Sequence, residues 1–137
     1  MHGPFAFRMQ NAEVIRELIE RWNAGDIDGV LDLYAPDAVT HTGPHWPEQE
    51  SHRGREAIRA SMEEWRSVWE VVEAEIHDLE EFGDKVVTTG SWRIRGGASG
   101  VGGEMPIFIV FTLRDGKIAV LEWYENRDTA VAAARGA

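Results

Sequence analysis

The fold is decided by residues 105–126, MPIFIVFTLRDGKIAVLEWYEN, near the end of the chain. Two runs rich in β-branched and aromatic residues flank Asp115-Gly116, a strong signal for a two-residue β-hairpin. We therefore predict that residues 116–126 form a strand that turns back on a strand at 105–113. The earlier strand is apolar on both faces, so both faces are expected to be covered.

Helices can cover one face of such a sheet, but little chain remains to cover the other. We therefore predict a curved sheet with helices in its concavity and a homodimer formed through the outer face of the sheet. Alternation divides the 105–113 strand into two sets. Phe108 is assigned to the interior, whereas Ile109 is assigned to the dimer, so Ile109→Asp is expected to separate the subunits.

Composition restricts the possible partners. The 137 residues fit one domain, which we place at 11–137 after an N-terminal arm at 1–10. A formal charge of -10 disfavours nucleic acid and anionic membranes, and the absence of cysteine excludes disulfides and thiolate metal sites. No apolar run approaches the roughly 20 residues of a membrane span. The start of the chain lacks a signal-peptide pattern, so a cytoplasmic protein is expected.

The remaining helices and strands are largely segregated along the chain. Apolar residues at helical spacing predict a first helix from Asn11 to about Trp22 and a second over 27–34, which includes Tyr34. A short strand is expected at 38–42, a long loop at 43–53, and a third helix at 54–68. Strands at 71–82 and 85–95 and a final helix at 127–134 complete the chain. Segregated helices and strands predict the α+β class.

Three motifs carry a resemblance to a known family. They are WNAGDID at 22–28, LYAPDAV at 33–39 and RGREAI at 53–58, followed by DGKI at 115–118 and YENRDTA at 124–130. These residues resemble the nuclear transport factor two-like superfamily, and within it the SnoaL-like group fits best. The resemblance implies a cone-shaped, cystatin-like α+β barrel, in which a curved antiparallel sheet wraps around three N-terminal helices and opens on an apolar pocket, usually in a homodimer.

The family includes ketosteroid isomerases, polyketide cyclases, epoxide hydrolases and pure binding proteins, so the fold does not settle the chemistry. The catalytic groups of the ketosteroid isomerases fall at Thr42, Leu18 and near Phe108 in this sequence. Those of the epoxide hydrolases fall at Gly90, Trp92 and Trp123. Both catalytic sets are therefore expected to be absent.

Alternation along the strands predicts a pocket lined by aromatic residues and a few hydroxyls, suited to an apolar, planar ligand. Gly90 is expected to leave space in it. The predicted lining is Trp22, Tyr34, Thr40, Thr42, Met62, Trp65, Trp92, Phe108 and Trp123. The alternative is that these side chains simply fill the core, because protein interiors pack to near-crystal density.

Polar candidates for catalysis are few. Tyr34, His41 and Glu104 are the candidate acid or base groups, with Glu104 expected at the pocket rim. His45 and Trp46 belong to the 43–53 loop, which we interpret as a lid. The same loop contains imidazoles and carboxylates, but their spacing matches no metal motif, and a solvated loop is the favoured interpretation. No cofactor is expected. The glycine-rich segment 96–103 lacks the other parts of a phosphate loop, and we interpret it as a hairpin tip.

Three functions therefore remain open. The leading hypothesis is a SnoaL-like small-molecule protein that acts on or binds an apolar, polycyclic metabolite, with isomerase or cyclase chemistry if it is an enzyme. The second is a non-catalytic binding or carrier protein with the same pocket. The third is a structural dimer module with a filled core.

Overall fold

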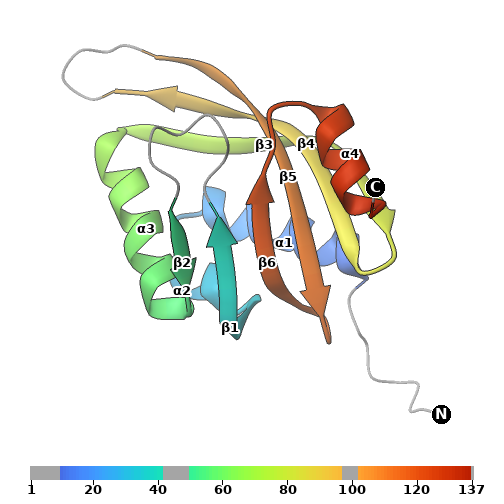
Figure 1. The fold of residues 1–137 in the computed structure, drawn as a ribbon. Helices are drawn as coiled ribbons and strands as arrows, with labels where there is room; N and C mark the ends of the chain where they lie inside the picture. The colour runs from blue at the N-terminus through green and yellow to red at the C-terminus, as the bar shows by residue number, and fades with distance from the viewer. Residues whose placement is uncertain (1–9, 42–49, 97–101, 137) are drawn as a thin grey trace.

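The computed structural model describes residues 10–41, 50–96 and 102–136 (Figure 1). Its centre is a six-stranded sheet with the order β2-β1-β6-β5-β4-β3. The bounds are Tyr34–His41 for β1, Ser51–Arg53 for β2, Val71–Phe82 for β3, Lys85–Arg95 for β4, Gly102–Arg114 for β5 and Lys117–Trp123 for β6. Strands β3 to β6 form an antiparallel meander, and β1 joins β6 in parallel. The predicted α+β class is confirmed.

The hairpin that anchors the prediction has the expected geometry. Asp115 and Gly116 both adopt positive φ, at 54° and 78°, which is the conformation that lets a two-residue turn follow the twist of its strands. Strand β5 pairs with β6 from Arg114↔Lys117 to Ile109↔Trp123. The turn sets the first pairs of the hairpin, and a register shift between Thr112 and Leu113 then places Trp123 opposite Ile109 on the interior face.

Three helices lie on the interior face of the sheet and enclose the main core. They are α1 (Asn11–Asn23), α2 (Ile27–Leu31) and α3 (Arg55–Val68). Helix α1 buries Val14, Ile15, Leu18 and Trp22, the apolar stripe that its spacing predicts. It begins one residue after Gln10, whose backbone N–H donates to the side chain of Glu13. Gly25, at φ 78°, allows the chain to leave the helix in a left-handed turn.

The region between α2 and α3 differs from its prediction. Tyr34 belongs to β1 rather than to the second helix, because the chain leaves α2 after Leu31 and pairs Tyr34 with Ile118 of β6. The register shifts between Tyr34 and Val39, which accommodates Pro36, a residue without a backbone donor. Residues 51–53, predicted as loop, form the short edge strand β2, which pairs with the end of β1.

The outer face of the sheet is partly covered by the chain itself. Helix α4 (Arg127–Ala134) lies across β4 and β5 on the side opposite α1 (Figure 1). Its Ala130 and Ala134 pack with Val87 and Val110 in a second, smaller core. A second subunit was expected to cover this face, but at Val110 the last helix covers it.

Candidate functional site

Five of the six tryptophans gather at one end of the interior face, and we call them the tryptophan cluster: Trp22, Trp65, Trp69, Trp92 and Trp123. Trp92 is central, with ring centroids 5.6 Å from Trp22, 6.0 Å from Trp65 and 6.5 Å from Trp123. Trp65 also meets Trp69 at 5.8 Å. Edge-to-face and stacked pairs at these distances are favourable arrangements of aromatic rings.

The cluster is assembled from four elements. Trp22 ends α1, Trp65 lies on α3 and Trp69 directly follows it, Trp92 is on β4, and Trp123 ends β6. Only Trp22 is fully buried, at 6% exposed, whereas the other four rings are half-buried. The cluster therefore packs on the core and also leaves aromatic surface accessible, which a fully buried core would not do.

Polar contacts hold the cluster's helices in place. The Arg66 guanidinium lies 4.7 Å from the centroid of the Trp22 ring and donates to the backbone carbonyl of Trp22 at 3.1 Å. It thereby combines a cation–π contact with a cap on the last turn of α1. The Asn23 amide donates to the Ala74 carbonyl at 2.8 Å and accepts from the Ala74 N–H at 2.9 Å, which ties α1 to β3.

Three side-chain donors near the interior remain unpaired. Within the part of the chain that the structure describes, the Nε1 atoms of Trp22 and Trp69 and the Oγ1 atom of Thr88 are buried without a hydrogen-bond partner. An indole N–H can only donate. A ligand with acceptor oxygens, or a water molecule, can satisfy such groups.

Most of the predicted lining lies on the interior face. Trp22, Met62, Trp65, Trp92 and Trp123 all belong to the main core or pack against it. Thr40 is 9% exposed and pairs with Leu121, which places it on the same face.

Strand β5 has the opposite phase to its prediction. Ile107 and Ile109 are buried in the main core, and alternation therefore turns Phe108 to the outer face. The prediction that Phe108 lines the interior was wrong, as was the assignment of Ile109 to a subunit interface. Both faces of β5 are apolar, so composition alone could not reveal its phase.

Gly90 also has a different role from the one predicted. A Cβ atom at Gly90 would lie 2.1 Å from the carbonyl oxygen of Glu75, so the backbone of β3 occupies the space. The register of β3 shifts between Ile76 and Asp78, beside this glycine. Gly90 thus permits a β-bulge and close approach of the neighbouring strand rather than opening a cavity.

The three candidate catalytic residues do not converge. Tyr34 is 1% exposed, and its burial raises the pKa of its hydroxyl above the ordinary value. It pairs with Ile118 of β6, five residues before Trp123 and about 15 Å from it along that strand, and is thus separate from the tryptophan cluster. His41 faces outward, where its Nδ1 lies 2.7 Å from Ser51 Oγ. Glu104 is exposed opposite Arg93 on the outer face, so its prediction at the pocket rim was wrong.

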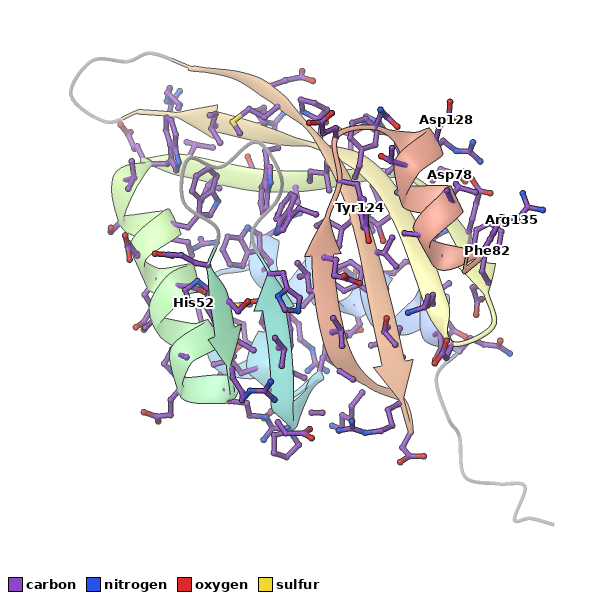
Figure 2. The ribbon with its side chains drawn as sticks, in the orientation of Figure 1. His52, Asp78, Phe82, Tyr124, Asp128 and Arg135 are labelled. Atoms are coloured by element: carbon purple, nitrogen blue, oxygen red, sulfur yellow. The ribbon has the colours of Figure 1, made fainter. Side chains whose placement is uncertain are left out.

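Two residues near the site were missed. Trp69 adds to the cluster, and its spacing of four from Trp65 was the available signal. His52 pairs with the buried Thr40 across β1 and β2 and therefore shares the interior face. Its side chain is 27% exposed and lies beside β2 in Figure 2. No signal in the sequence could place His52 there, because a three-residue strand has no recognisable period.

Thr42, His45 and Trp46 lie outside the described residues, so the predicted lid and one predicted lining residue stay predictions. No group of three potential metal ligands converges within residues 10–41, 50–96 and 102–136. None of the helices described is long and apolar enough to cross a membrane.

A separate hollow of about 330 Å³ lies on the surface between α2 and α3. Its lining is Asp28, Leu31, Asp32, Arg55, Glu56 and Arg59. Arg55 donates to the Tyr34 carbonyl, and Arg59 forms an ion pair with Asp28. These arginines therefore hold α3 against β1 and α2. We interpret the hollow as a surface depression within this structural contact.

The model of the SnoaL-like domain family matches residues 15–121. The chain belongs to the SnoaL-like family. The matched segment includes four of the five motifs of the family resemblance, those at 22–28, 33–39, 53–58 and 115–118. It ends on β6, before the fifth motif at 124–130. No curated protein matches this SnoaL-like chain in sequence.

Solved structures share the whole fold. A nuclear transport factor two-like protein of unknown function from Burkholderia pseudomallei is 19% identical, with a TM-score of 0.75 over 94% of this chain and 100% of that one. A protein from Mesorhizobium loti described as a SnoaL-like polyketide cyclase is 24% identical, with a TM-score of 0.68 over 85% and 100%. TerC, co-crystallised with polyporic acid, is 21% identical, with a TM-score of 0.74 over 93% and 98%.

The family match confirms the predicted family, and these likenesses confirm the predicted fold. At such identities they do not transfer a reaction to this SnoaL-like chain. Its function must be argued from its own residues.

Proposed function

We propose that this SnoaL-like protein binds a planar, largely apolar small molecule against the tryptophan cluster. The observation that carries the proposal is that four of the five clustered rings are only half-buried, although all five pack on the main core. Aromatic side chains left accessible at the end of a curved sheet are typical of ligand sites, where a few polar groups then set orientation.

The unpaired donors define the ligand further. The buried Nε1 of Trp22 has no partner among the described residues, and leaving such a donor unsatisfied costs about 1–3 kcal/mol. A ligand with carbonyl or phenolic oxygens at its edge can accept these bonds while its rings stack on the indoles. Polycyclic phenols and quinones combine both properties.

Calorimetric titration with 2-naphthol and with polyporic acid tests the proposal. We expect wild-type protein to bind at least one of them, and Trp92→Leu to weaken binding by about tenfold or more, because stacking on a ring is worth about 1–3 kcal/mol. Phe82→Leu is the matched control, since Phe82 packs under α4 on the outer face. Absence of binding, or equal effects of the two variants, would contradict the proposal.

Isomerase- or cyclase-type chemistry is the second candidate function. Two observations favour it: the fold is shared with a protein described as a polyketide cyclase, and a histidine lies on the interior face. Turnover of a bound polycyclic ligand, followed by mass spectrometry and nuclear magnetic resonance, separates this candidate from a carrier, which would release the ligand unchanged.

A further inference from the structure

His52 is a side chain of the interior face, on the short edge strand β2. Strand β2 pairs with β1 in the register Thr40↔His52 and His41↔Ser51. The bond of 2.7 Å between His41 Nδ1 and Ser51 Oγ fixes those two side chains on the outer face. Since neighbours along a strand alternate, His52 and Thr40 must point to the interior.

The sheet register also relates His52 to the tryptophan cluster. Thr40 pairs with Leu121 of β6, and Trp123 is two residues further along that strand. Two interstrand steps of about 4.8 Å and two residues of about 3.3 Å separate the Cα atoms of His52 and Trp123 by about 12 Å. One planar ligand that stacks on the cluster can therefore reach the imidazole.

The environment of His52 leaves its ring able to bind a ligand. Among the described residues its nearest ionic partner is Glu50, with 3.8 Å between Nε2 and the carboxylate oxygen, which is longer than a hydrogen bond. The side chain is 27% exposed. An imidazole offers one donor and one acceptor in its neutral form, so it can pair with either a hydroxyl or a carbonyl oxygen.

We propose that His52 is the specificity-determining residue of the site, which recognises an oxygen substituent on the bound aromatic ligand. This inference rests on the proposed function, because it assumes a ligand on the tryptophan cluster. It names the ligand class more narrowly: a fused aromatic ring system with a hydroxyl or carbonyl oxygen on the edge that faces β2.

A pair of probes of equal shape tests the assignment. 2-Naphthol and 2-methylnaphthalene differ in a hydroxyl against a methyl group, so the ratio of their dissociation constants isolates the polar contact. We expect His52→Phe to reduce the preference for 2-naphthol by about fivefold to tenfold, the worth of one hydrogen bond. His52→Gln, which keeps a donor and an acceptor, should retain part of the preference.

His41→Phe and His77→Phe are matched controls, because both histidines lie on the outer face. They should leave the ratio unchanged. Equal ratios in wild type and His52→Phe, with both probes bound, would overturn the role of His52 alone and leave the proposed function standing. Failure of wild-type protein to bind either probe or polyporic acid would overturn both. Thermal melts of the variants confirm that each is folded.

Discussion

A single missing side chain shapes the sheet beside the tryptophan cluster. Because a Cβ atom at Gly90 would lie 2.1 Å from the Glu75 oxygen, Gly90→Ala requires β3 to move. We expect the free energy of unfolding to fall by about 1–3 kcal/mol. Gly103→Ala is the control, since nothing lies within 4 Å of its added Cβ, and should change stability by no more than about 0.5 kcal/mol. Equal urea midpoints for the two variants would show that the bulge absorbs the methyl group.

Tyr34 makes stability depend on alkaline pH. Its burial raises the pKa of the hydroxyl, so the folded protein keeps the neutral form above the pH at which the unfolded chain ionises. The stabilisation is complete below about pH 10 and is lost as pH rises above it, by up to about 1.4 kcal/mol per pH unit for one proton. Urea unfolding between about pH 9 and 11.5, a range around the ordinary tyrosine pKa of about 10, measures the slope.

Tyr34→Phe should flatten this slope. Tyr124, whose pKa is also raised by burial and by the Glu122 carboxylate, is only half-buried, so Tyr124→Phe should change the slope less. A slope that survives in Tyr34→Phe would assign the alkaline sensitivity to another group.

At the scale of elements, α4 covers part of the outer sheet face that a second subunit was expected to cover. Ala130 is 0% exposed against Val87 and Val110, whereas Ala132 on the same helix is exposed. Ala130→Asp places a carboxylate in that contact and should lower the free energy of unfolding by about 2–4 kcal/mol. Ala132→Asp should cost no more than about 0.5 kcal/mol. Similar melting temperatures for the two variants would mean that α4 is not docked in solution.

Elements with a clear period were predictable from the sequence. The strands β3 and β4 have their predicted bounds, because glycine turns delimit them, and the Asp115-Gly116 turn fixed the last hairpin. Tyr34 was misplaced because its spacing from Leu31 continues a helical pattern, and only pairing with Ile118 makes it a strand residue. Tertiary pairing overrode the local signal.

The candidate site was less predictable than the fold. The interior tryptophans followed from alternation on β4 and β6, each of which has one clearly apolar face. On β5 both faces are apolar, because the core takes Ile109 and α4 takes Val110, so its phase could not be read and Phe108 and Glu104 were misplaced. His52 depends on the register of β2, which only the structure supplies.

For the whole molecule, the homodimer remains a prediction, now restricted to the outer face that α4 leaves open. Val39, Phe108 and Val120 are half-buried there, on β1, β5 and β6. We expect a dimer in sedimentation velocity and its dissociation by Val120→Asp. Val68→Asp is the matched control, because Val68 is 60% exposed on α3. A monomeric wild type would contradict the dimer, whereas Ile109→Asp should unfold the chain rather than divide it.

The pairing of Asn23 with Ala74 also bears on aggregation. Strand β3 is the last of the sheet, and a bare edge of 12 residues is a template for pairing with another chain. The Asn23 amide pairs with the backbone N–H and carbonyl of Ala74 on that edge, as a residue of a neighbouring strand would. Asn23→Ala should therefore raise light scattering during heating more than Asn11→Ala does. Equal scattering would mean that the edge is protected by other groups. One side chain thus both docks a helix and keeps the sheet from growing.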